Sequence, residues 1–266
     1  MGIQEGLTDP VCGLNMGQTA EVLAKEYGIS RKEQDEFALM SHRRATAARA
    51  KLAEEIVPVH VGPDYKTVVD KDNGVRENQS MEDLAKLKPF FDRVAGTVTA
   101  GNSSQITDGA CALLVMPEEK AKSLGFTPLG YLRSYDYQGL DPRRMGLGPA
   151  YAIPTALRKA DLKLQDIGLI EINEAFAAQV IACERALESD KFGREELGLG
   201  GAAGKIDRDI LNVNGGAIAI GHPVGSTGSR LILTLLLEMK RRNVKYGVVA
   251  LCIGGGQGAA AVLERE

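Results

Sequence analysis

Two short glycine-rich stretches in the last fifth of the chain each hold one side chain that can move a proton. His222 lies in the stretch 214–223, and Cys252 directly precedes the glycine run of 253–258. Glycine leaves room for a ligand beside the backbone and adopts dihedral angles that other residues resist, so we expect both side chains on tight turns that line a cleft. An imidazole titrates near neutral pH and a thiol is a nucleophile or an acid, so the two stretches predict acid–base or thiol chemistry.

Each of these residues also has an ordinary structural interpretation. A buried cysteine is most often an inert small hydrophobe. The glycines after Cys252 favour catalysis, because their N–H groups could lower the pKa of its thiol and hold a developing oxyanion. His222 is the one histidine in a glycine-rich turn. It could be a proton shuttle or thiolate partner, or a loop histidine that is hydrogen-bonded to the backbone.

Two further polar residues lie where strands are expected to end. Asn173 follows the apolar stretch 169–172 and could be the N-cap of the next helix, or could hold a catalytic water or a carbonyl oxygen at the carboxyl end of a strand. Ser103 and Ser104 allow the same pair of interpretations, capping or ligand contact. Cys111 and Cys183 lie in apolar surroundings and are interpreted as core thiols.

The elements that must position these residues alternate between strand and helix. We expect strands at 167–172, at 248–251 and at 259–263, and helices from about 174 and around 231–237. The last of these helices is apolar nearly all round, which predicts burial between layers. The pattern indicates an α/β fold of layered sheets with helices inside.

The upstream part combines helices with a loop-rich segment. Ser30 and Glu33 form a capping box that predicts a helix to about residue 53, with His42 on its solvated face. Residues 57–95 read as a loop-rich excursion, and 109–116 as an apolar strand. The stretch 109–115 resembles 258–263, which suggests a duplicated unit whose second copy, 117–266, is complete and whose first copy is represented only by its end.

Composition excludes several function classes. The chain has 266 residues and a net charge of −3, without a long run of one sign that would suit nucleic acid or an anionic membrane. Its four cysteines form no Cys-x-x-Cys pair, so neither a metal site nor a disulfide framework is predicted. We expect no membrane span and no export signal, hence a cytoplasmic protein whose partner is a small molecule or another protein.

Three motifs together resemble the signatures of the thiolase family: Asn-Glu-Ala-Phe at 173–176, Gly-His-Pro at 221–223, and Cys-Ile-Gly-Gly-Gly-Gln-Gly at 252–258. The similarity continues upstream through 16–21 and 101–104. The resemblance implies the thiolase fold, a layered αβαβα arrangement of two similar halves. In this chain it implies a loop-domain insertion with helices at 1–95, the last segment of the first half at 96–116, and the C-terminal domain at 117–266.

The resemblance also implies roles for individual residues. Members of the family pass an acyl group between coenzyme A thiols through a cysteine thioester, with no permanently bound cofactor and no metal. Cys252 would be the acid/base at the substrate α-carbon, and His222 would activate the nucleophilic cysteine. His222 and a water held by Asn173 would stabilise one oxyanion, and the N–H of Gly254 the other. Ser104 would contact the pantetheine arm of coenzyme A.

None of the four cysteines matches the family's nucleophile, which lies upstream of the 16–21 stretch. We therefore expect a chain that lacks the first α/β half, is inactive alone and is completed by a second protein chain, in a homo- or hetero-oligomer. By the same resemblance, Asn15 and the long loop 189–208 favour a 3-ketoacyl-CoA of undefined length over acetoacetyl-CoA as the substrate. The alternative is a non-catalytic protein of thiolase fold for coenzyme A binding or assembly.

Overall fold

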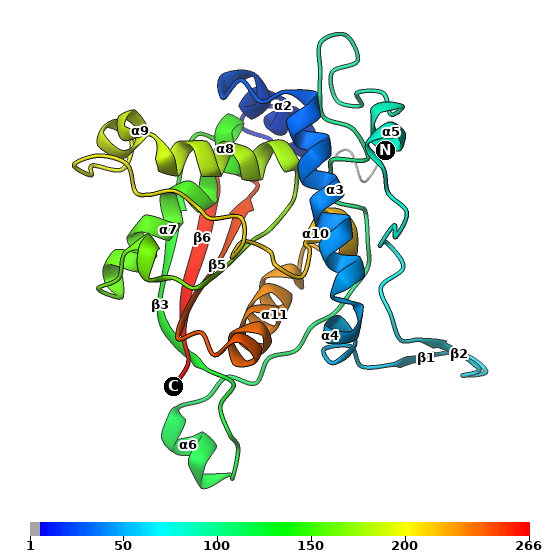
Figure 1. Ribbon diagram of the computed structural model, residues 1–266, viewed down its shortest axis with the longest axis vertical. Coiled ribbons are helices and arrows are strands. Elements are labelled where there is room, and N and C mark those ends of the chain that lie inside the picture. The colour runs from blue at the N-terminus through cyan, green and yellow to red at the C-terminus, as the bar shows by residue number, and fades with distance from the viewer. Residues whose placement is uncertain (1–5) are drawn as a thin grey trace.

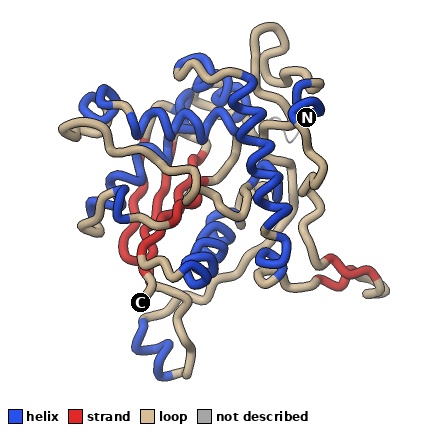
Figure 2. Tube along the Cα trace, viewed as in Figure 1, coloured by secondary structure: helices blue, strands red, loops and turns tan. Residues whose placement is uncertain are grey.

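A four-stranded mixed sheet organises the molecule. The computed structural model describes residues 6–266. The expectation of no export signal was made on residues 1–5, which lie outside the described residues. The strand order is β3 (Tyr131–Gly139), β6 (Gln257–Glu264), β5 (Tyr246–Ile253) and β4 (Leu169–Ile172). β4 runs parallel to β5 and the other pairs are antiparallel. β3, β5 and β6 are labelled in Figure 1, and the strands are red in Figure 2. The predicted α/β architecture is confirmed.

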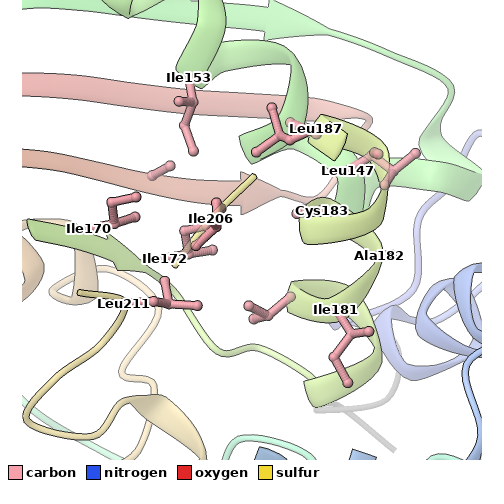
Figure 3. Close-up of a cluster of buried hydrophobic side chains, with 14 of the residues drawn as sticks. Leu147, Ile153, Ile170, Ile172, Ile181, Ala182, Cys183, Leu187, Ile206 and Leu211 are labelled. Atoms are coloured by element: carbon pink, nitrogen blue, oxygen red, sulfur yellow. The ribbon is translucent and has the colours of Figure 1, made fainter. Parts of the chain in front are cut away.

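Helices cover the two faces of this sheet. Ile170 and Val248 pack in one cluster with residues of α7 (Gly148–Lys159) and α8 (Ala177–Glu188), part of which is drawn in Figure 3. Their neighbours Leu169 and Val249 pack on α11 (Thr227–Arg242). Because successive strand side chains point to opposite faces, α11 and the α7/α8 pair lie on opposite sides of the sheet. The apolar helix around 231–237 is thus largely buried, as predicted.

The N-terminal helices pack against α8. α2 (Met16–Glu26) and α3 (Arg31–Ala47) both contact it, and α3 also contacts the short α10 (Ala217–Ile220). The capping box of Ser30 and Glu33 is present at the start of α3. The predicted helix is interrupted at Ala48, after which α4 covers Arg49–Ala53. α2 and α3 bring the first fifth of the chain next to the strand ends described below.

The loop-rich excursion contains a small hairpin of its own. β1 (Val59–Val61) and β2 (Thr67–Val69) pair antiparallel and project from the body of the molecule, and α5 (Met81–Ala85) follows (Figure 1). The remaining elements are α6 (Glu118–Ser123), the 3₁₀ turns η1 (Pro142–Leu147) and η2 (Leu164–Asp166), and α9 (Asp190–Glu195). α9 lies inside the segment predicted as a loop. Among residues 6–266, no helix is long and apolar enough to cross a membrane.

The expected strand at 109–116 does not form. No part of this segment is assigned to a ladder, and the side chains of Leu114 and Val115 are 74% and 82% exposed. An apolar sequence becomes a strand only where a neighbouring strand takes up its N–H and C=O groups, and none of the described strands lies beside this one. The apolar composition of 109–116 is typical of a strand, but the partner strand that a strand needs cannot be inferred from composition.

Candidate functional site

Asn173 and His222 meet at the carboxyl end of β4. The Asn173 N–H donates to the Ala250 carbonyl on the neighbouring strand at 3.0 Å, which extends the β4–β5 pairing by one residue. Its side-chain Nδ2 lies 3.3 Å from His222 Nε2. α8 begins only at Ala177, with Phe176 as its N-cap, so Asn173 is not the cap of that helix. The interpretation of Asn173 as the N-cap of the next helix is therefore excluded.

The hydrogen bonds of His222 select one tautomer. Nδ1 lies 2.7 Å from Thr227 Oγ1, and that hydroxyl donates its hydrogen to the Pro223 carbonyl at 3.0 Å. Because the hydroxyl has one hydrogen, it must accept from an Nδ1–H. Nε2 then carries a lone pair and accepts from the Asn173 amide. His222 is bonded by side chains and not only by the backbone, with its basic nitrogen held toward Asn173.

The turn before His222 depends on glycine. Gly221 has a φ of +97°, and a Cβ there would come within 2.5 Å of Thr107 Cγ2. The His222 N–H donates to Thr107 Oγ1 at 2.8 Å. A larger residue would be strained in this backbone conformation and would displace Thr107. Gly221 therefore fixes the position of the imidazole, and Thr107 is a supporting residue that sequence reasoning missed.

Burial keeps His222 neutral. The imidazole is largely desolvated, which lowers its pKa to about 4, and the charge of Arg230 acts in the same direction. At neutral pH Nε2 thus keeps its lone pair, which accepts from the Asn173 amide. The Oδ1 atom of Asn173 is buried without a hydrogen-bond partner among the described residues, so it can accept a hydrogen bond from a water or a ligand.

Substitution of Thr227 with valine is expected to weaken the tautomer preference of His222. Valine has the same shape and lacks the acceptor, so the Nδ1–H form loses one hydrogen bond of about 1 kcal/mol, or roughly fivefold in the tautomer ratio. The measurement is the pair of imidazole ¹⁵N chemical shifts of His222. Thr234→Val is the matched control, because Thr234 is also buried on α11 and bonds Glu55 instead. If the His222 ¹⁵N chemical shifts were the same in Thr227→Val and Thr234→Val, the tautomer assignment would be contradicted.

Cys252 lies on β5 beside the end of β4. Its side chain is 8% exposed and packs with Met145 and Ala175, with Met16 and Phe176 at the edge of the cluster. Burial raises the pKa of its thiol to about 12. The expectation that nearby glycine N–H groups lower this pKa is wrong, because desolvation dominates at this position. The thiol is protonated at neutral pH, which suits a proton donor.

The glycine turn after Cys252 contains an N–H group, that of Gly254, without an acceptor among the described residues. Gly255 and Gly256 have φ angles of +85° and +76°, which L-residues rarely adopt. The Gly255 N–H donates to Asp9 Oδ2, and the Gly256 carbonyl accepts from Leu140. No described residue accepts the N–H of Gly254, whose backbone faces the Met16 thioether. Gly254 can therefore donate to a ligand atom.

Backbone contacts connect Ser104 to the same site. Its N–H donates to the Ala175 carbonyl at 2.9 Å, and Ser103 forms an antiparallel bridge with Phe176. Ala175 in turn packs on Cys252. Among the described residues, the Ser104 hydroxyl has no hydrogen-bond partner, so it is open to a ligand. All five predicted site residues are thus gathered around the ends of β4 and β5, but their roles stay predictions.

A buried carboxylate that the sequence analysis did not single out holds this arrangement together. Glu174 accepts from the Ser41 hydroxyl, the Asn212 amide and the Ile218 N–H. The Asn212 side chain also bonds both backbone groups of Ile172. α3, β4 and the segment leading to His222 are therefore joined at one point. The only sequence signal for this role was the position of Glu174 next to Asn173.

Other chemistry-bearing residues lie elsewhere or have structural roles. His42 is buried and accepts from the Arg76 N–H, so the expected solvated face is wrong there. Cys183 is a core thiol as predicted. Cys111 is not, because it is partly exposed and lines a hollow of about 460 Å³ with residues 107–110 and 223–226. Residues 6–266 contain no cluster of three or more groups that could hold a metal.

Comparisons with known proteins place this geometry in a family. Residues 126–265 match the model described as "Thiolase, C-terminal domain", and residues 1–119 match "Thiolase, N-terminal domain". The expectation that the chain lacks the first half is therefore wrong. The expectation of a separate completing chain is not supported either, because both domain models match this one chain.

Two similar proteins are longer than this chain. A 3-ketoacyl-CoA thiolase of Shewanella halifaxensis is 49% identical over 96% of the chain and 59% of its own length. One from Escherichia coli O157:H7 is 48% identical, over 100% and 62%.

The solved structures agree with this fold. The Bacillus anthracis acetyl-CoA acetyltransferase superposes with a TM-score of 0.88 at 42% identity, covering 99% of this chain and 63% of its own. Human mitochondrial 3-ketoacyl-CoA thiolase in complex with CoA gives 0.83 at 39% identity, with 99% and 62% covered. The chain thus spans about three fifths of the length of these relatives.

Proposed function

The chain belongs to the thiolase family, and from that premise we propose that it acts in acyl transfer between a 3-ketoacyl-CoA and coenzyme A. The observation that carries the proposal is the contact of Asn173 with His222. It leaves a neutral imidazole with its basic Nε2 at the ends of β4 and β5, where a protonated Cys252 thiol is also buried. A neutral base and a protonated acid at one site are what reversible cleavage of a carbon–carbon bond requires.

His222 acts on the nucleophilic thiol. Its Nε2 exchanges the hydrogen bond from the Asn173 amide for the proton of the coenzyme A thiol, and the thiolate attacks the 3-keto carbon of the substrate. The imidazolium and a water bound to Asn173 Oδ1 then face the oxygen that becomes negative. None of the four cysteines of the chain matches the family's nucleophile, so the thiol on which His222 acts is that of coenzyme A.

Cys252 acts on the carbon that leaves. Breaking the bond between carbons 2 and 3 sends its electron pair into an acetyl-CoA enolate, and the Cys252 S–H supplies the proton to that carbon. The free N–H of Gly254 donates to the enolate oxygen. The acyl group leaves as its coenzyme A thioester, and the proton on the His222 imidazolium returns to the Cys252 thiolate. In the direction of synthesis, His222 takes the Cys252 proton, and the resulting thiolate removes the same proton from the α-carbon.

Substrate binding completes the proposal. The unpartnered Ser104 hydroxyl lies beside Ala175 and is placed to contact the pantetheine arm. Asn15 is engaged as the N-cap of α2, where its side chain accepts from the Gln18 N–H. We extend the proposal to 3-ketoacyl-CoA substrates of undefined length and to an oligomeric protein. We also propose a cytoplasmic location, and the four free cysteines support this location.

The test is thiolysis of 3-ketoacyl-CoA substrates of increasing length by the purified protein with coenzyme A, followed by mass spectrometry of the acyl-CoA products. The proposal predicts two products, acetyl-CoA and an acyl-CoA shortened by two carbons. Binding of coenzyme A without either product would favour the non-catalytic alternative. Neither binding nor turnover would reject both.

A further inference from the structure

Asp9 links the N-terminal segment to the glycine turn that follows Cys252. Its Oδ2 accepts from the Gly255 N–H at 2.8 Å, across a sequence separation of 246 residues. Its Oδ1 accepts from the N–H groups of Val11 and Cys12, at 2.8 and 3.2 Å. The residue is only 3% exposed. A nearly buried carboxylate thus uses both oxygens on backbone N–H groups, one of which belongs to the candidate site.

The segment that carries Asp9 is itself closely held. The Asp9 N–H donates to the Leu14 carbonyl, the Asp9 carbonyl accepts from Gly13, and the Met16 N–H donates to the Leu7 carbonyl. Residues 7–16 therefore form a compact loop that ends at the start of α2. The same loop delivers Met16, whose thioether lies 3.5 Å from the position that a Cβ on Gly254 would occupy.

The glycine turn needs such support. Three consecutive glycines have more backbone freedom than any other tripeptide, and two of them have positive φ. The turn is held by the Asp9 carboxylate at Gly255 and by the Leu140 N–H at the Gly256 carbonyl. Gln257 bonds the Gly254 carbonyl. The N–H of Gly254 is left without an acceptor among the described residues, whereas the Gly254 carbonyl and the Gly255 N–H are both hydrogen-bonded.

We propose that Asp9 is a positioning residue for the oxyanion donor: by binding the Gly255 N–H, it fixes the turn so that the Gly254 N–H points to the substrate oxygen. A donor to a developing oxyanion is effective only if it is held in place before the reaction. The Asp9 carboxylate is suited to this task, because its N–H bonds, with that of Val11 the largest contribution, lower its pKa and keep it ionised. The role of the Gly254 donor rests on the proposed function, whereas the support of the turn does not.

The test compares Asp9→Ala and Asp9→Asn with Asp92→Ala. Asp92 is a matched control, because its carboxylate also accepts two backbone N–H groups, from Val94 and Ala95, and pairs with Lys25. The first readout is amide hydrogen exchange of the segment 253–258, which does not require turnover. The second is the effect on kcat and on KM of thiolysis.

In Asp9→Ala we expect exchange of this segment to rise at least about tenfold, the ratio that corresponds to loss of one hydrogen bond to a charged group. We expect kcat to fall about tenfold or more with KM nearly unchanged, as for loss of a contact made only in the transition state. Asp9→Asn, which keeps the shape and one acceptor oxygen, should lie between Asp9→Ala and wild type. Asp92→Ala should match wild type in both readouts.

Wild-type exchange in both Asp9 variants would overturn the inference, as would an equal rise in Asp92→Ala. Faster exchange with unchanged kcat would also overturn it, because the turn would then be loosened without effect on the donor. A wild-type protein without thiolysis activity would count against the proposed function, while exchange would still decide whether Asp9 holds the turn.

Discussion

Cys252→Ala is expected to lower kcat for thiolysis about 10²- to 10⁴-fold, the usual contribution of a positioned acid or base. The thiol is protonated at neutral pH because burial raises its pKa to about 12. It is therefore ready to protonate an enolate at a position that is only 8% exposed. Cys252→Ser should also lose most of the activity, because an alcohol is a much weaker acid than a thiol. Affinity for coenzyme A should remain, since the thiol acts on the leaving carbon.

Cys183→Ala is the control for this experiment. Cys183 is likewise a buried thiol with a raised pKa, but its S–H donates to the Gly146 carbonyl inside the core. Its loss should cost about 1 kcal/mol of stability and leave kcat within roughly twofold of wild type. Near wild-type turnover in Cys252→Ala, with coenzyme A bound normally, would contradict the acid/base role.

His222→Ala is expected to lower kcat/KM by a similar factor, about 10²- to 10⁴-fold. The variant loses the base that takes the thiol proton and the imidazolium that faces the oxyanion. The control is His60→Ala, because His60 is exposed on β1, away from the strand ends. Equal losses in both variants, or none in His222→Ala, would contradict the assignment.

The pH dependence of His222 follows from the direction of its pKa shift. The folded pKa is about 4, below the ordinary value of 6.5, so the folded state binds fewer protons than the unfolded state between these values. The stability linked to this group is therefore present above pH 6.5 and is lost as the pH falls toward 4. Titration of His222 by NMR should show a midpoint near 4, and an activity loss caused by its protonation should lie there. A midpoint near 6.5 would contradict a desolvated imidazole.

The sequence identified the local features of this protein well. The capping box of Ser30, the order of β4, α8, α11, β5 and β6, and the glycine turn after Cys252 all follow from short-range rules of propensity and periodicity. Asn173, His222 and Cys252 were recognisable because each directly follows a strand or lies in a glycine-rich turn. The signal that identified them is therefore local, although their contacts, such as that of His222 with Thr107, are not.

The features that escaped prediction depend on distant partners. Asp9 meets Gly255, and Ser41 meets Glu174, across long sequence separations. Nothing local distinguishes these side chains from a turn residue and a helix surface residue. The stretch 109–116 failed in the opposite way, because its apolar sequence suits a strand but no described strand pairs with it. His42 was misjudged from its basic neighbours, since burial depends on which element packs over a helix face.

Exchange of the α-protons of acetyl-CoA in D₂O tests the central claim most directly, because it reports the proton transfer assigned to Cys252 without requiring carbon–carbon cleavage. Deuterium in the acetyl group is measured by mass spectrometry for wild type, Cys252→Ala and Cys183→Ala. The account predicts that wild type and Cys183→Ala incorporate deuterium faster than buffer alone and that Cys252→Ala does not. Incorporation by Cys252→Ala at the wild-type rate, or none above buffer in wild type, would contradict it.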